Sequence, residues 1–193
     1  MRPTRVTVIL ALVALGAVLT VAVAGCGGSD RGRASGQFGW LRPASTPTGW
    51  KVTRIPGGAM LAYPPGWTPI KTDPGTASVA LLGRGGRING YLNATPRQGI
   101  ETLADWTRFR PQHNKGEGDR DVRLLAATTT ARFRSGRGAC VIDTYTTSKA
   151  SYREIACLVS STGSSAVVVA AAPTALWNQQ AATLQRAVSS FVA

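Results

Sequence analysis

Beyond residue 50 the chain alternates between apolar and polar positions in short runs, and turns rich in glycine and proline separate these runs. A period of two residues with such breaks is typical of antiparallel strands. In the first half we expect strands at Val52–Ile55, Ala59–Tyr63, Ser78–Leu82 and Arg87–Asn93. In the second half the runs are longer, and their short connections predict a four-stranded meander at Val122–Arg134, Ala139–Thr146, Ser151–Ser160 and Ser165–Ala171.

Two segments change to a helical period. Thr95, Pro96 and Gln98 have the order of an N-cap hydroxyl, a proline at the first helical position and a glutamine three residues after the cap. They predict a helix from Pro96 to about Arg108, ended before Pro111, with a polar loop over 112–121. Its apolar face would hold Ile100, Leu103 and Ala104, and its wet side Arg97 and Glu101. A second helix is predicted by apolar residues at steps of four and three: Trp177, Ala181, Leu184, Val188 and Phe191.

These elements together predict an α+β fold. An antiparallel β-sheet meander would be covered by the helix of the N-terminal half and by the C-terminal amphipathic helix. A chain of 193 residues suits one domain, which we expect to span 38–193.

The N-terminal segment has a different pattern. Arg2 and Arg5 precede an apolar run over 6–24, and Val23-Ala24-Gly25-Cys26 follows. A charged start, an apolar stretch and small residues before a cleavage point are typical of a secretory signal, here residues 1–25. The last four residues resemble the lipobox of bacterial lipoproteins, and that resemblance implies diacylglycerol on the Cys26 sulfur. The alternative is a membrane-spanning helix, for which about nineteen apolar residues are long enough. Either way the rest of the chain would be tethered outside the cytoplasm.

Residues 26–37 are small and polar, and they predict a flexible tether. The formal net charge of the chain is +13, with 22 Lys+Arg against 9 Asp+Glu. A basic domain held near a membrane could contact anionic lipid or an anionic wall polymer, or the charge could serve solubility alone. We expect a lipid anchor in the cell membrane, with the domain on the extracytoplasmic side. Export and the lack of a recognised nucleic-acid-binding motif argue against a nucleic-acid partner.

Cys140 and Cys157 are the cysteines left for a disulfide in that oxidising compartment. A turn centred between Ser148 and Lys149 places these two residues directly opposite each other in a hairpin. If the turn has two residues, the pair is of the non-hydrogen-bonded kind, which brings the side chains closer and favours a disulfide. A turn of four residues would keep the pairing and reverse the bonding type.

The same register gives the two faces of the hairpin different characters. Ile142 and Ile155 share the cysteine face, which we expect to be the buried one. The other face would place Asp143 opposite Glu154 and Tyr145 opposite Tyr152. Like charges directly opposed in a sheet are destabilising, and Arg132 or Arg134 could offset them. This face is either a patch for a cation or polar ligand or a salt-bridged surface.

The segment around His113 is the strongest candidate for chemistry. It combines the chain's one imidazole with the carboxylates of Glu117, Asp119 and Asp121 in an otherwise basic protein. These groups could bind a hard cation or act in acid–base catalysis, or they could be a solvated loop paired with nearby arginines and lysines. The candidate ligand or cation patch therefore comprises His113, Glu117, Asp119, Asp121, Asp143, Glu154, Tyr145 and Tyr152.

One further motif points to a known family. Ala62-Tyr63-Pro64-Pro65-Gly66-Trp67 resembles the opening of secreted PsbP-like domains, and a helix, a long meander and a final amphipathic helix follow it. The resemblance covers about 50–193. It implies the fold of the PsbP extrinsic photosystem protein, shared with a Ran-binding import factor and small actinobacterial lipoproteins, and binding of proteins or small apolar ligands.

No nucleophile elbow, phosphate-binding loop or zinc spacing occurs in the sequence. We therefore expect a non-catalytic, lipid-anchored envelope protein that binds a protein, a ligand or a wall polymer and needs no cofactor. The alternative is an envelope hydrolase or metal-dependent enzyme that uses His113 and nearby carboxylates. It would be favoured if His113 lay in a pocket within hydrogen-bond reach of Glu117, Asp143 or Glu154.

Overall fold

The computed structural model describes residues 36–193. The predicted signal segment, the predicted lipidation site Cys26 and most of the predicted tether lie outside the described residues. None of the helices in the described part of the chain has the length and apolar character needed to cross a bilayer.

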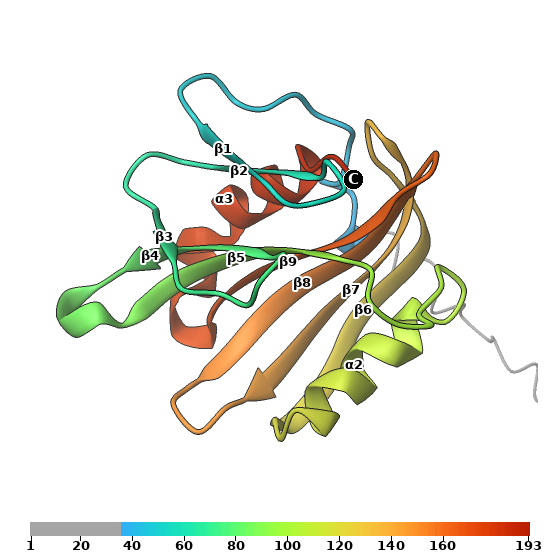
Figure 1. Ribbon diagram of the computed structural model, residues 1–193. Helices are drawn as coiled ribbons and strands as arrows, with labels where there is room; N and C mark the ends of the chain where they lie inside the picture. The colour runs from blue at the N-terminus through green and yellow to red at the C-terminus, as the bar shows by residue number, and fades with distance from the viewer. Residues whose placement is uncertain (1–35) are drawn as a thin grey trace, which may run out of the picture.

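The fold is an antiparallel sheet with one long helix on each side (Figure 1). Seven strands lie in the order β3-β4-β5-β9-β8-β7-β6, and β1 and β2 form a separate hairpin. The strands are β1 Lys51–Arg54, β2 Met60–Tyr63, β3 Thr68–Ile70, β4 Ala77–Leu82, β5 Ile88–Pro96, β6 Arg120–Arg132, β7 Gly136–Thr146, β8 Ser151–Ser161 and β9 Ser165–Pro173. The helices are α2 Trp106–Gly116 and α3 Trp177–Ser189, with short 3-10 turns η1 Arg84–Gly86 and η2 Thr174–Leu176. This is the predicted α+β class.

We call the two sides of the sheet the α3 face and the α2 face. On the α3 face a large apolar core joins the sheet to α3, the β1–β2 hairpin and the segment around Phe38 and Leu41. The predicted stripe of the last helix belongs to this core, because Leu184, Val188 and Phe191 are fully buried. On the α2 face a smaller cluster joins Trp106 to residues of β7, β8 and β9.

The predicted hairpin register is confirmed. Cys140 lies opposite Cys157, Ile142 opposite Ile155, Asp143 opposite Glu154 and Tyr145 opposite Tyr152. Thr147 N–H donates to the Ala150 carbonyl at 2.9 Å, which closes a two-residue turn. The cysteines form a disulfide with a Cα–Cα distance of 4.1 Å, the short spacing of a non-hydrogen-bonded pair.

The prediction that only the cysteine face of this hairpin is buried was wrong. Asp143 and Glu154 point to the opposite face, and their exposed fraction is 0%. The reason is that α2 covers this part of the sheet from the other side. The central strands are therefore buried on both faces, and the acidic pair lies inside the protein.

The first predicted helix was also misplaced. The segment at Thr95–Pro96 continues β5, pairing with Val167 and Ala166 of β9, and the helix begins at Trp106. A second capping pattern lies in the turn just before the helix: Thr102 N–H donates to Asp105 Oδ1 at 2.7 Å, and Asp105 N–H donates to Thr102 Oγ1 at 3.3 Å.

The far end of this helix also differs from the prediction. The helix runs through Pro111 to Gly116, so half of the predicted loop is helical and His113 lies on α2. Because the helix begins only at Trp106, residues 100 and 101 lie in the loop before it. Ile100, predicted on an apolar helix face, is 92% exposed, and Glu101, predicted on the wet side, is 5% exposed.

The two edges of the sheet are irregular. At one edge β3 has three residues, with Pro69 in the middle. At the other edge the pairing of β6 with β7 shifts register at three places. Both features interrupt the row of backbone groups that an edge strand presents to other chains.

Candidate functional site

Helix α2 is positioned on the sheet by its first buried residue. Trp106 is 2% exposed, and its indole Nε1–H donates to the Ala156 carbonyl of β8 at 3.1 Å. One turn apart along the helix, Phe109 stacks on Trp106 at 5.8 Å between ring centroids, and His113 stacks on Phe109 at 5.9 Å. The spacing of three and four residues puts these rings on one side of α2, beside the uncovered part of the sheet.

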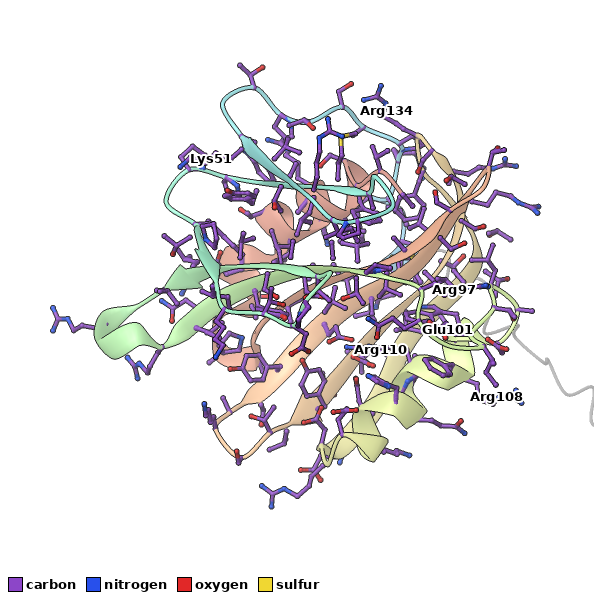
Figure 2. The ribbon with its side chains drawn as sticks, viewed as in Figure 1. Lys51, Arg97, Glu101, Arg108, Arg110 and Arg134 are labelled. Carbon is purple, nitrogen blue, oxygen red and sulfur yellow. A yellow bond between two sulfur atoms is a disulfide. The ribbon has the colours of Figure 1, made fainter. Side chains whose placement is uncertain are left out.

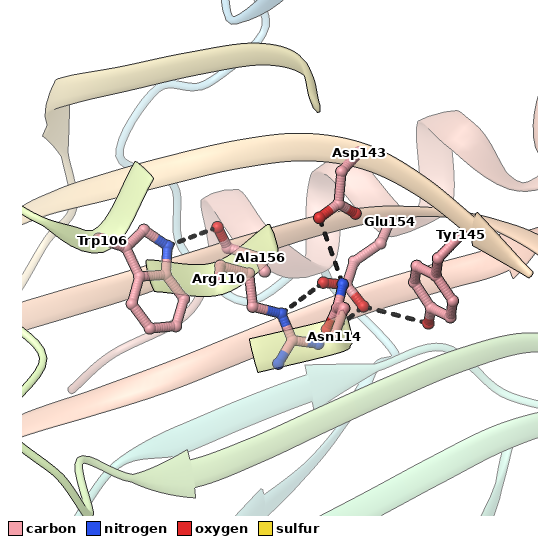
Figure 3. Close-up of polar contacts among 7 residues, drawn as sticks. All are labelled: Trp106, Arg110, Asn114, Asp143, Tyr145, Glu154 and Ala156. Atoms are coloured by element: carbon pink, nitrogen blue, oxygen red, sulfur yellow. Dashed lines mark hydrogen bonds and ion pairs between the residues drawn. The ribbon is translucent and has the colours of Figure 1, made fainter. Parts of the chain in front are cut away.

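A buried ion pair connects α2 to β8 (Figure 3). Arg110 Nε donates to Glu154 Oε1 at 2.7 Å, and Arg110 Nη2 donates to Glu154 Oε2 at 2.9 Å. The Tyr145 hydroxyl donates to Glu154 Oε2 at 3.2 Å. Although burial alone disfavours the guanidinium charge, the charge and hydrogen bonds of Glu154 raise the pKa of Arg110 above its usual value. Arg110 therefore stays charged, and it neutralises Glu154 in place of the predicted Arg132 or Arg134.

Asp143 lies directly across the ladder from Glu154. Asn114 Nδ2 of α2 donates to Asp143 Oδ2 at 3.3 Å, while Oδ1 is buried without a hydrogen-bond partner among the described residues. Burial, and after it the charge of Glu154, raise the pKa of Asp143 to about 8. Since the carboxyl is then mostly protonated at neutral pH, the buried pair carries about one negative charge, which Arg110 balances.

On the α2 face, Ser78 of β4 and alternate residues of β5 form a polar surface with no helix over it. Along β5, Tyr91, Asn93 and Thr95 alternate with the buried Leu92 and Ala94. The Thr95 hydroxyl donates to Asn93 Oδ1 at 2.8 Å, and Asn93 Nδ2 donates to Ser78 Oγ at 2.9 Å. The hydroxyls of Ser78 and Tyr91 lie 3.1 Å apart in a further hydrogen bond. These side chains form a continuous hydrogen-bonded row across two strands.

This polar row is part of the floor of an open groove between α2 and the β3–β4 connection. The groove has a volume of about 630 Å³. Aromatic, hydroxyl, amide and carboxylate groups all contribute to its lining, which consists of Thr72, Asp73, Thr76, Tyr91, Asn93, Thr95, Pro96, Gln98, Gly99, Glu101, Trp106, Phe109, Arg110, His113, Glu117, Tyr145, Glu154, Val167 and Val169.

Glu101 is the most unusual member of this lining. It is 5% exposed; its Oε1 accepts the Gln98 backbone N–H at 3.2 Å, and its Oε2 has no partner among the described residues. A Cβ at position 99 would collide with Oε2, so a side chain there would displace the end of Glu101 from its present position. The groove thus contains a buried carboxylate with spare hydrogen-bonding capacity.

The groove is acidic within a basic protein. Four of the 9 Asp+Glu residues of the chain line it, namely Asp73, Glu101, Glu117 and Glu154. Among residues 36–193 only Glu154 forms an ion pair. The other three carboxylates therefore leave the groove with a local negative charge.

The residues predicted for the candidate patch are divided by the structure. His113, Glu117, Tyr145 and Glu154 line the groove. Asp143 is bonded to Asn114 of α2 outside the lining, Tyr152 stacks on Tyr145 at 5.8 Å, and Asp119 and Asp121 follow α2, also outside the lining. Burial, followed by the charge of Glu154, raises the pKa of Asp119. Within residues 36–193 no three His, Cys, Asp or Glu side chains converge closely enough to hold a metal ion.

Sequence reasoning missed Arg110, Glu101 and the polar row on β5. The row had a local signal, since Tyr91, Asn93 and Thr95 are polar or amphipathic at every second position of a strand. Arg110 and Glu101 had none, because their partners depend on where α2 lies on the sheet.

Comparisons with known proteins support the architecture. No family model matches the sequence, and no curated protein matches it. The solution structure of cyanobacterial PsbP, CyanoP, from Synechocystis is similar, with a TM-score of 0.54 and 18% identity over 75% of this chain and 92% of CyanoP. LpqN of Mycobacterium tuberculosis, described as involved in cell envelope biogenesis, has a TM-score of 0.38 and 15% identity over 76% of this chain and 79% of LpqN. The likeness to CyanoP shows that the chain has a PsbP-like fold.

Proposed function

We propose that the chain is a non-catalytic, lipid-anchored protein of the cell envelope and that its groove binds a hydroxyl-rich ligand, such as a segment of wall glycan. Diacylglycerol on Cys26 anchors it to the extracytoplasmic side of the cell membrane, and residues 26–37 connect the anchor to the domain. The observation that carries the ligand class is the hydrogen-bonded row of Tyr91, Asn93 and Thr95, set between aromatic rings in an open groove.

A sugar ring has hydroxyl groups that both donate and accept, and faces of C–H groups that pack on aromatic rings. The row on β5 offers hydroxyl and amide groups that also do both. The carboxylates of Asp73, Glu101 and Glu117 accept hydrogen bonds, and Tyr91 and Phe109 provide apolar surface. Binding sites for small molecules combine such apolar walls with a few polar groups that fix orientation.

The arrangement of the charged groups supports binding rather than catalysis. Glu154 is held by two hydrogen bonds from Arg110 and one from Tyr145, which leaves it poorly available as a general base. The His113 side chain stacks on Phe109, and no hydrogen bond joins it to a carboxylate within the described range 36–193.

The enzyme alternative keeps one observation in its favour, because His113, Glu117 and Glu154 line the same groove. An envelope hydrolase or metal-dependent enzyme would use these groups. To distinguish a binding protein from a hydrolase, the protein is incubated with wall glycan fragments and the masses of the fragments are followed. A binding protein leaves the fragments intact. A hydrolase shortens them, and its His113→Ala variant does not.

The binding experiment is a calorimetric titration with soluble wall glycan fragments and with chitotetraose. Tyr91→Phe removes one hydroxyl, Glu101→Gln removes one charge, and each should weaken binding by about tenfold. Asp121→Asn is the matched control, since this exposed carboxylate lies outside the groove. Saturable binding of spermine with no binding of any neutral oligosaccharide would overturn the ligand class.

The anchor has its own test. Cys26→Ser should abolish labelling by radioactive palmitate and release the protein from the membrane fraction or leave it unprocessed. Normal processing and normal membrane retention in this variant would contradict the lipoprotein proposal, whatever the groove binds.

A further inference from the structure

The ends of five adjacent strands lie side by side at one end of the sheet. The register places the end of β5, the start of β9, the end of β8, the start of β7 and the end of β6 side by side. Adjacent strands are about 4.8 Å apart, so this row of ends is about 19 Å wide. In Figure 1 these ends and the β5–α2 loop lie at the right of the molecule.

Exposed arginines are concentrated along this row. Arg132, Arg134 and Arg137 flank the β6–β7 turn, and Arg97 follows the last residue of β5. Arg108 is exposed in the first turn of α2, and Figure 2 shows Arg97 and Arg108 at the right of the molecule and Arg134 at its top. Within residues 36–193 none of these arginines forms an ion pair. Two carboxylates are close in sequence, but Glu101 is buried, and Asp105 accepts the Thr102 N–H and forms no ion pair with these arginines.

The same side carries an isolated apolar side chain. Ile100, in the β5–α2 loop three residues after Arg97, is 92% exposed, whereas the other large apolar residues described as exposed reach at most 48%. An isoleucine held in water between Arg97 and Arg108 costs free energy that packing within the chain does not recover. An interface with headgroups and acyl chains accepts both kinds of residue.

The chain enters the domain at this side too. Phe38 and Leu41 line a cavity of about 800 Å³ together with Thr107 of α2 and residues 127–132 of β6. Residues 26–35 therefore precede a point close to the β6–β7 turn and to the start of α2. A chain anchored at Cys26 would hold this side of the domain, rather than the opposite one, closest to the membrane.

We propose that the strand-end surface, made of Arg97, Ile100, Arg108, Arg132, Arg134 and Arg137, docks on the anionic lipid surface to which the protein is anchored. This proposal rests on the lipid anchor of the proposed function. The arginines contact phosphate groups of the lipids, and Ile100 enters the boundary between headgroups and acyl chains. The groove then has a fixed orientation toward the envelope.

The test uses the mature chain with Cys26→Ser, which has no acyl group, and vesicles of phosphatidylglycerol mixed with phosphatidylcholine. Cosedimentation should show binding to these vesicles and little binding to phosphatidylcholine alone. Each arginine near an anionic surface contributes about fivefold to binding, so the triple variant Arg132→Gln, Arg134→Gln, Arg137→Gln should bind about a hundredfold more weakly. Ile100→Ser should weaken binding by about tenfold.

The matched control removes the same charge from the opposite end of the sheet. Arg84, Arg87 and Arg123 are exposed, and β5 starts directly after Arg87. The variant Arg84→Gln, Arg87→Gln, Arg123→Gln should keep most of the binding. An equal loss in both triple variants would mean that net charge alone drives adsorption, and it would overturn the proposal.

A second comparison separates lipid from polymer. If the protein binds soluble polyphosphate as tightly as vesicles and Ile100→Ser has no effect, the surface recognises an anionic polymer and the membrane proposal fails. Either failure leaves the palmitate labelling and the glycan titration unaffected, so the proposed function is judged separately.

Discussion

The two faces of the sheet are built on different physical principles. The α3 face is an apolar core, in which Leu184 and Val188 of α3 and Phe191 after it belong to one cluster with Ile142, Ile155 and the disulfide. The α2 face buries a charge network, with Arg110 bonded to Glu154 and Asp143 alongside. On the first face stability depends on volume and shape, and on the second it depends on charge balance and protonation.

The faces also differ in how far they are covered. The core on the α3 face includes residues of every strand from β4 to β6 in the order of the sheet, whereas the cluster under α2 is made of residues of β7, β8 and β9, with Tyr91 of β5 and Ala127 of β6 at its margins. The face with polar chemistry is thus the one left partly open. One face therefore contributes mainly to folding stability and the other carries the groove. We expect that mutations can change one of these properties without changing the other.

The largest effect is expected for the charge network. Arg110→Ala leaves the buried carboxylate of Glu154 without its counter-charge, and the free energy of unfolding should fall by about 3–5 kcal/mol. Urea denaturation measures this loss. Arg108→Ala is the control, since Arg108 is exposed two residues away and its removal should cost less than about 0.5 kcal/mol. A loss below about 1 kcal/mol for Arg110→Ala would indicate that Glu154 is not charged in the folded state.

On the α3 face the corresponding change is Leu184→Ala. Leu184 is fully buried, so the substitution should lower the free energy of unfolding by about 2–5 kcal/mol through lost burial and a cavity. Unlike the loss at Arg110, this loss should be the same across pH. Leu82→Ala, at a side chain that is 45% exposed, should have a much smaller effect. If the loss in Leu184→Ala relative to wild type itself changed strongly with pH, the two faces would be coupled.

The disulfide should contribute somewhat less to the free energy of unfolding than Arg110 or Leu184. It closes a loop with a sequence separation of 17, for which about 3 kcal/mol is expected. Replacing Cys140 and Cys157 by alanine should lower the urea midpoint accordingly, and the oxidised wild-type chain should run faster than the reduced one on a denaturing gel. Equal mobility of the two forms would argue that the bridge is absent from the protein.

The smallest expected effect on stability concerns Asp143. Its pKa rises from an ordinary value of 3.8 to about 8 on folding, through burial and the charge of Glu154. As the pH rises through this range the unfolded chain loses its proton first, so the folded state becomes progressively less stable between about pH 4 and pH 8. Asp143→Asn should flatten this decline and be at least as stable as wild type at pH 8. A wild-type stability that rises over the same range would contradict the assigned protonation.

Local rules predicted the meander, the cysteine pairing and the final helix because these depend on neighbours in sequence. The turn at Ser148–Lys149 sets the register of a whole hairpin, so Cys140 and Cys157 could be paired from their numbers alone. The stripe of α3 shows in its spacing because that helix buries one side only.

The first helix illustrates where local rules fail. Two capping patterns compete, one at Thr95 and one at Thr102, and propensity does not decide between them. Pairing with β9 extends β5 through Pro96, so the helix begins only after the second pattern. The site was missed for the same reason, because the partners of Arg110 and the burial of Glu101 follow from where this helix lies.

The irregular edges of the sheet have a further consequence under the lipid anchor that we propose, which would confine the protein to a surface. Molecules held in two dimensions meet repeatedly with similar orientation, and a flat exposed strand would let them join into fibrils through backbone pairing. Pro69 in the short β3 and the three register shifts of β6 deny both edges to a second copy. We therefore expect that crowded molecules with this fold do not polymerise through pairing of their edge strands.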